Sequence, residues 1–172
     1  MRPLTLILIA IVCAPAFAAR AQNITNAPAT QIENFELQPD AVVVKGFGEV
    51  GSVTTSAGAI SVRCKESANA TSGRKEYGVA IVLESPNPAY QPLLVVDYDE
   101  LNSLARGLDF LGKITYDATT MPAFDATFAT KSGFRAVAHS ERRNGGIRDF
   151  LQFGDAPRIP LTSDQFAQFE NL

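Results

Sequence analysis

Apolar and polar residues alternate with a period of two along several short stretches, and this period predicts β-strands. The stretch 32–37 alternates in this way and is a possible edge strand. Runs rich in β-branched and apolar residues, bounded by small or polar ones, predict strands later in the chain. These further strands are expected at 41–45, 58–66, 76–84 and 93–96.

A period close to 3.6 then predicts one clear helix. Four leucines recur at spacings of three, four and three residues, which places them on one helical face. Asp97 can cap the start of this helix, and Glu100 three residues later completes a capping box. Gly107 costs about 1 kcal/mol relative to alanine inside a helix, and a close approach to the sheet would explain it. The four leucines are Leu101, Leu104, Leu108 and Leu111.

Two turn signals organise the next part of the chain. Lys131-Ser132-Gly133 has the pattern of a three-residue hairpin loop, with glycine where a left-handed conformation is required. It joins expected strands at 124–129 and 134–141. Asn144-Gly145 is the favoured two-residue hairpin turn, and it leads into an expected strand at 147–153.

The chain ends on a second helix signal, because Thr162 and Gln165 form another capping box, followed by Phe166 and Phe169 facing the core. The predicted order is four or five strands, a helix, three strands and a helix. Tight hairpins require antiparallel pairing. We therefore expect a single α+β domain over 31–172, with two helices on one face of a curved antiparallel sheet or partial barrel of about seven to eight strands.

Residues 1–21 have the anatomy of a secretory signal peptide. Arg2 supplies a positive charge, 4–12 is a short apolar run, and Ala19-Arg20-Ala21 is the candidate cleavage site. The apolar run is too short to span a bilayer, which requires about 20 residues, and no later segment is long enough. We expect an exported protein, periplasmic or extracellular, whose residues 22–30 form a disordered lead-in.

Composition narrows the class of protein further. Hydrophobic residues make up 46% of the chain and charged residues 19%, which excludes a disordered chain. The net charge is −3, and loss of Arg2 and Arg20 with the signal peptide leaves 13 basic against 18 acidic residues, or −5. Such an acidic domain is a poor candidate for binding nucleic acid.

The cysteine count excludes an internal disulfide. Cys13 would leave with the signal peptide, so Cys64 would be the sole cysteine of the exported chain. Alternation places Ile60, Val62 and Cys64 on one face of a strand. We expect Cys64 to be a small buried hydrophobe, and a reactive free thiol is the alternative.

A glycine-rich motif matches the pattern of a dinucleotide-binding loop. It reads Gly46-Phe47-Gly48-Glu49-Val50-Gly51, but a dinucleotide site requires this loop to open a helix. The following residues 52–58 are too few and too β-prone for such a crossover. We expect these glycines to mark a bulge or bend in a long strand, and we expect no cofactor.

His139 is the only histidine, which excludes a metal site built on two or three histidines. No serine-elbow motif is present, so nucleophilic catalysis has little support. The acidic cluster Asp97, Asp99 and Glu100 lacks the calcium-loop pattern and is explained by the favourable charge at a helix start. We assign no catalytic, cofactor-binding or metal-binding residues.

The two hairpins predict a specific strand register. The Lys131–Gly133 loop places Asp125 opposite His139, and the Asn144-Gly145 turn places Phe150 on the other side of His139. Asp125 would accept a hydrogen bond from His139 and favour its charged form. The alternatives are an exposed pair worth under about 1 kcal/mol, or a pH-sensitive patch on the open sheet face with Phe150 as an apolar contact.

The segments from Val96 to Ile114 and from Ala129 to Gly133 contain the helix start, the leucine stripe and the hairpin loop. They resemble parts of small uncharacterised secreted bacterial proteins of no known activity. They cover about a third of the chain, their motifs are structural, and no functional residues follow from them.

The leading hypothesis for function is an exported non-enzymatic domain that binds a protein, peptide or small ligand. The alternatives are an exported hydrolase using Cys64 or a carboxylate pair, and a structural accessory protein of the cell envelope.

Overall fold

The structure is a computed structural model that describes residues 30–87, 90–141 and 145–172, and these ranges form three α-helices and eight strands. The predicted signal peptide and nearly all of the predicted lead-in lie outside the described residues. The elements are α1 Gln31–Glu36, β1 Val43–Thr55, β2 Gly58–Asn69, β3 Lys75–Glu84, β4 Leu93–Asp97, α2 Leu101–Gly112, β5 Phe124–Ala129, β6 Phe134–Ser140, β7 Arg148–Phe153, β8 Ile159–Leu161 and α3 Ser163–Glu170.

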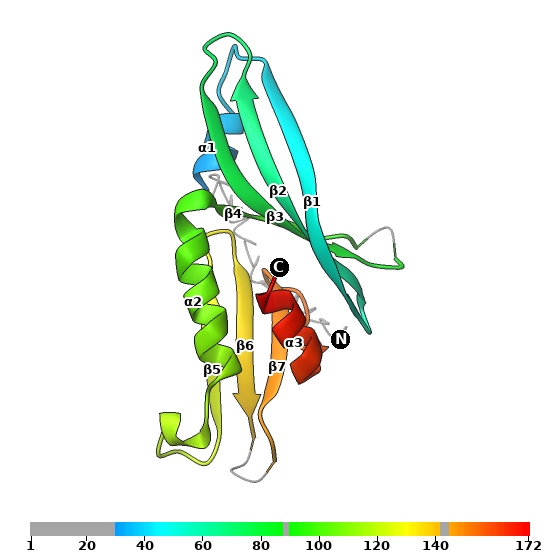
Figure 1. The fold of residues 1–172 in the computed structure, drawn as a ribbon, viewed down its shortest axis with the longest axis vertical. Coiled ribbons are helices and arrows are strands. Elements are labelled where there is room, and N and C mark those ends of the chain that lie inside the picture. The colour runs from blue at the N-terminus through cyan, green and yellow to red at the C-terminus, as the bar shows by residue number, and fades with distance from the viewer. Residues whose placement is uncertain (1–29, 88–89, 142–144) are drawn as a thin grey trace, which may run out of the picture.

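The strands form two antiparallel sheets. Sheet A has the order β1-β2-β3-β4 and sheet B the order β5-β6-β7-β8, so neighbours in sequence are neighbours in space (Figure 1). The predicted α+β class with antiparallel pairing is confirmed. The strands are divided between two sheets instead of forming one curved sheet or partial barrel, and the described residues contain one helix more than expected.

The main core lies where one face of sheet A meets α2, α3 and one face of sheet B. Figure 1 shows α2 running alongside β5 and β6, with α3 across β7. The leucine stripe is confirmed, since Leu104, Leu108 and Leu111 are buried, and so is the second capping box at Thr162. Side chains from both sheets complete the core, including Ile60, Val62, Ile81, Val96, Phe134, Leu151, Phe153, Phe166 and Phe169.

Gly107 is the point where α2 comes closest to sheet B. A Cβ atom at this position would lie 2.3 Å from Cδ2 of Phe128 on β5, far inside van der Waals contact. Glycine has a lower helix propensity than alanine, but its lack of a side chain lets the helix pack against the sheet at this position. The close approach suggested by the sequence is confirmed.

The predicted edge strand at 32–37 is wrong, because this segment is the helix α1. Thr30, the last residue of the predicted lead-in, caps it, and the side chain of Glu33 returns a bond to the Thr30 amide. Ile32 and Phe35 share one helical face and are both buried. The capping box and the i,i+3 apolar pair are helical signals that outweigh the short alternation.

Asp97 also differs from its prediction, because it caps α1 and not the leucine helix. Its carboxylate accepts hydrogen bonds from the backbone amides of Gln31 at 2.8 Å and Ile32 at 3.1 Å. It makes no capping bond to its own helix, which begins with a single 3₁₀ turn, Tyr98–Glu100. A carboxylate therefore satisfies orphan amides of a helix 66 residues earlier in the chain.

The glycine motif lies within β1, as expected, and forms a bulge. The register with β2 shifts between Glu49 and Gly51, which leaves Val50 as the extra residue. The expected strand at 41–45 is thus the start of a 13-residue strand. Among the described residues no helix follows the glycines directly, so they do not form a dinucleotide loop.

Cys64 is exposed, so its predicted burial is wrong. Alternation assigned its face correctly, because Ile60 and Val62 on that face are buried in the main core. Sheet A extends beyond the core at Cys64, and Gly48 opposite it on β1 has no side chain to cover the thiol. On the other face α1 buries Lys65, whose ammonium pairs with Glu36 at 2.6 Å.

Candidate functional site

The β5–β6 hairpin brings Asp125 and His139 together as predicted. The Lys131–Gly133 loop has Gly133 at φ +87°, and the two strands pair with Asp125 directly opposite His139. Asp125 Oδ1 lies 2.5 Å from His139 Nδ1. The carboxylate therefore fixes the orientation of the imidazole ring through Nδ1 and directs Nε2 away from Asp125.

The predicted position of Phe150 is wrong by two residues along the strand. Arg148 lies opposite His139, and Phe150 lies opposite Val137. The predicted Asn144-Gly145 turn falls partly outside the described residues, and Gly146 takes the left-handed conformation at φ +78°. Because the shift is even, Phe150 keeps its predicted face, and its ring meets the His139 ring edge-on at 6.2 Å between centroids.

Arg158 is a member of the site that the sequence analysis missed. It directly precedes β8, a three-residue strand that the sequence analysis did not predict. Its guanidinium donates to both oxygens of Asp125, at 3.0 and 3.4 Å. Arg158, assisted by the His139 hydrogen bond, holds the pKa of Asp125 below its ordinary value.

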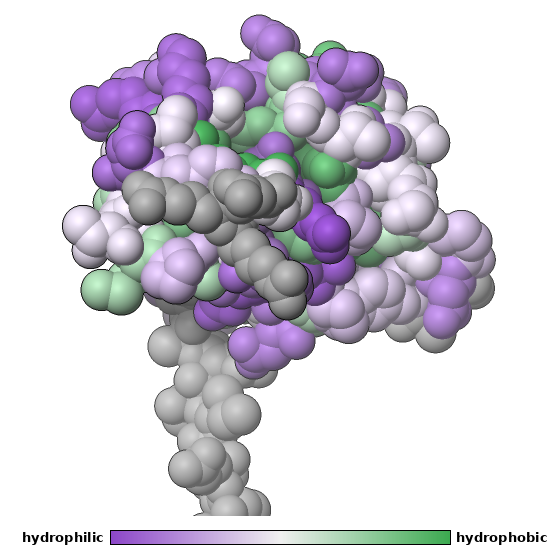
Figure 2. All heavy atoms as spheres, turned by 90° about the horizontal axis from the view of Figure 1, so that it is seen from below, coloured by the Kyte–Doolittle hydropathy of each residue, from purple (hydrophilic) through white to green (hydrophobic). Residues whose placement is uncertain are grey.

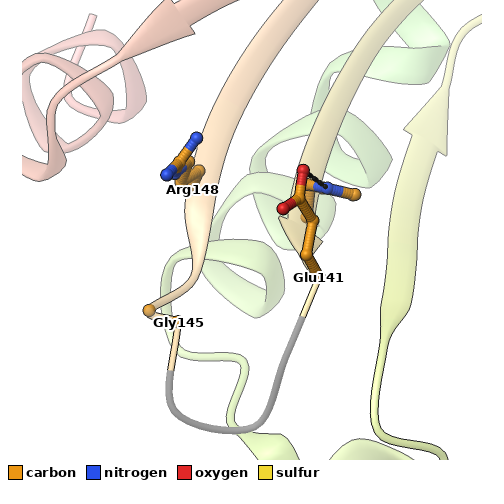
Figure 3. A pocket seen from close by; sticks show the side chains of 5 residues that line it. Glu141, Gly145 and Arg148 are labelled. Atoms are coloured by element: carbon orange, nitrogen blue, oxygen red, sulfur yellow. Dashed lines mark ion pairs between the residues drawn. The ribbon is translucent and has the colours of Figure 1, made fainter.

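A pocket of about 190 Å³ opens beside the imidazole, at the end of the β6–β7 hairpin. His139, Glu141 and Arg148 line it together with Gly145 and Gly146. Figure 3 shows Glu141 on the β6 side and Arg148 on the β7 side of this opening. Glu141 Oε1 is 3.7 Å from His139 Nε2, an ion-pair distance that is too long for a hydrogen bond.

Arg148 differs from the other charged groups of this site because none of its ion-pair or hydrogen-bond partners lies among the described residues. Asp125 pairs with Arg158 and His139, and Glu141 faces His139. Arg148 is exposed and forms no ion pair or hydrogen bond with any residue that the structure describes. Its guanidinium, which carries five N–H donors, lines the pocket.

The site lies on the face of sheet B that points away from α2 and α3, here called the open face. Figure 3 shows α2 behind the two strands that carry the pocket. At this end of the molecule hydrophilic side chains dominate the periphery and apolar ones gather in small groups (Figure 2). Such a surface suits recognition of a polar group better than a broad apolar contact.

Cys64 does not belong to this site. It lies on sheet A, where its Sγ is 3.3 Å from the carbonyl oxygen of Gly48. The core helices α2 and α3 lie on the opposite side of sheet B from His139. The structure therefore places the one described cysteine and the histidine apart, and gives no Cys–His pair for nucleophilic catalysis.

The acidic cluster at the start of the leucine helix surrounds a lysine. Lys131 Nζ lies 3.6 Å from Asp97, 3.5 Å from Asp99 and 3.9 Å from Glu100. The lysine of the hairpin loop thus offsets part of the negative charge of the cluster and ties sheet B to the start of α2. No group of three or more histidine, cysteine or acidic residues suited to a metal ion occurs in the described ranges.

No helix within the described residues is both long and apolar enough to cross a membrane. Comparison with protein-family models, curated protein sequences and solved structures gave no match. The argument for function therefore depends on the geometry of the site.

Proposed function

We propose that the protein is an exported, non-enzymatic binding domain whose open face on sheet B holds a carboxylate group of a peptide or protein partner. The observation that carries the proposal is Arg148, which lies opposite His139 at the mouth of a pocket and has no ion-pair or hydrogen-bond partner among the described residues. The signal-peptide pattern and the resemblance to secreted bacterial proteins support export, and a periplasmic or extracellular location follows from it.

The chemistry of the pocket favours a carboxylate. A guanidinium is a planar fork that matches the two oxygens of a carboxylate, and the His139 imidazole lies directly across the strands from it. Asp125 supports this arrangement because it holds the ring from behind, while Arg158 offsets its charge. Glu141, whose side chain is 76% exposed, already stands near Nε2, so an incoming carboxylate can take its place.

The size of the pocket favours a single side chain or a chain terminus. Its volume of about 190 Å³ is below the roughly 300–1,000 Å³ of pockets that enclose a whole drug-sized ligand. Phe150 lies beside the imidazole and offers an apolar contact to neighbouring groups of the partner. We therefore favour a peptide or protein partner over a free small molecule.

The test is an NMR titration of the isotope-labelled protein with a short capped peptide that contains a central glutamate. We expect shifts at the His139 ring and the Arg148 guanidinium, and the same peptide with glutamine should give much smaller ones. Arg148→Gln should abolish the shifts at His139. Arg74→Gln, which removes an exposed arginine from the loop before β3, should leave them unchanged.

Three outcomes would contradict the proposal. Equal shifts with the glutamate and glutamine peptides would show that the pocket does not recognise a carboxylate. Cleavage of the peptide during the titration would favour the alternative of an exported hydrolase. A structural accessory role would be favoured if neither peptide shifted any resonance of the open face.

A further inference from the structure

The outer edge of sheet A carries a row of backbone groups that point away from the sheet. The amide of Ala70 donates to the Val42 carbonyl at 2.9 Å, so Val42 directs its backbone groups toward β2. In an antiparallel pair this direction alternates along the strand. The residues of β1 that point outward before the bulge are therefore Val43, Lys45, Phe47 and Glu49.

Only one half of this edge is covered. After the bulge, α3 lies beside β1, where Gln168 Nε2 donates to the Ser52 carbonyl at 3.4 Å and Gln165 Nε2 to the Thr54 carbonyl at 2.8 Å. Before the bulge, no described residue bonds to the outward groups. Figure 1 shows this part of β1 as the free margin of the upper sheet.

We propose that this open half of β1 pairs with the same segment of a second copy of the chain. The pairing is antiparallel and centred on Phe47, so that a two-fold axis passes between the two Phe47 residues. Exchange of N–H···O bonds at Phe47 and at the two flanking pairs gives six backbone hydrogen bonds. Two sheets A then join into one continuous eight-stranded sheet.

The charges on β1 are complementary in this register. Lys45 of one copy lies opposite Glu49 of the other, and the same pair occurs again across the two-fold axis. Glu49 forms no ion pair within the described residues, whereas Lys45 already contacts Glu36 and keeps 46% of its side chain exposed. Opposite charges directly across two strands stabilise the pair, and like charges there destabilise it.

The apolar residues also match. Phe47, 56% exposed, meets Phe47 of the second copy, and Val44, 58% exposed, meets Val50, 47% exposed. Gly46 faces Gly48 and places no side chain between the strands. A β-strand from an unrelated protein would use the same backbone groups, but it would not carry this two-fold pattern of charge and apolar residues.

The first experiment is sedimentation of the purified protein over a wide concentration range. We expect a dimer for the natural sequence and monomers for both Lys45→Glu and Glu49→Lys, with a dissociation constant raised about tenfold or more by two like-charge contacts. An equimolar mixture of the two variants should form a heterodimer, because the opposite charges then meet again. Asp117→Lys makes the same charge change at an exposed site away from β1 and should leave the dimer intact.

The second experiment tests the register by crosslinking. In a Cys64→Ser background, Phe47→Cys should oxidise to a covalent dimer, since its two copies are directly opposite at a Cα separation of roughly 5.5 Å. Val44→Cys should not, since it faces Val50. A monomeric natural protein at every concentration would overturn the proposal. So would a dimer that Glu49→Lys leaves unchanged, or variants that fail to associate on mixing.

Discussion

Replacement of Gly107 by alanine sets two effects of known size against each other. Alanine gains about 1 kcal/mol over glycine in a helix interior. The new Cβ, however, would lie 2.3, 2.6 and 2.9 Å from three ring carbons of Phe128, one of them Cγ at the root of the ring. The ring cannot avoid this contact by moving only its far end.

Overpacking of this kind costs typically about 1–3 kcal/mol. We therefore expect Gly107→Ala to lower the free energy of unfolding by up to about 2 kcal/mol, despite its better helix propensity. Gly112→Ala is the matched control on the same helix. Its Cβ would lie 3.4 Å from the nearest atom, on Phe166, so the helix gain should prevail and the variant should be neutral or more stable.

The assay is urea unfolding followed by circular dichroism, with the free energy taken by linear extrapolation. A double-mutant cycle with Phe128→Ala isolates the contact. In that background Gly107→Ala should raise the free energy of unfolding, because the Phe128 ring that would overlap with the new Cβ is absent. A Gly107→Ala variant that is more stable than the natural protein while Phe128 is present would refute the account of this glycine.

The remaining predictions concern two aspartates. Asp97→Ala should lower the free energy of unfolding by about 1.5–3 kcal/mol, the contribution of a hydrogen bond to a charged acceptor, and should speed amide exchange at Ile32. Asp97→Asn retains one acceptor oxygen and should lower the free energy of unfolding by less. Unchanged amide exchange at Ile32 would contradict the capping role. Burial raises the pKa of Asp149, so the stability associated with its neutral form is complete at low pH and is lost as the pH rises through the pKa of the folded state. Asp149→Asn should therefore raise the free energy of unfolding by about 0.5–2 kcal/mol at pH 7 and by less near pH 3, and equal gains at both pH values would contradict this assignment.

Features that depend on neighbours in sequence could be predicted from the sequence. The loop at Lys131–Gly133 fixes the pairing of Asp125 with His139, because a three-residue turn and the pleat together determine which residues meet. The second hairpin shows the limit of this reasoning. The observed register of β6 and β7 differs from the predicted one by two residues, and Phe150 stays on its predicted face because this shift is even.

Features that depend on distant segments could not be predicted in this way. Asp97 has the local pattern of a capping residue, but the structure uses its carboxylate for α1. Alternation placed Cys64 on the correct face, yet nothing in the sequence shows where the core ends and solvent begins. Arg158 reaches Asp125 from 33 residues away, and no spacing rule connects them.

The tie between Asp97 and α1 has a consequence for the order of events during folding. A six-residue helix is far below the roughly 12–15 residues at which isolated helices become even marginally stable in water. The carboxylate of Asp97, which accepts hydrogen bonds from the first amides of α1, lies at the end of β4. Glu36 at the end of α1 forms its buried ion pair with Lys65 on β2. Both partners reach α1 only when these strands have folded. The helix α1 thus has no stable form until the sheet behind it has assembled, and a partly folded chain leaves Lys65 exposed to water in the meantime.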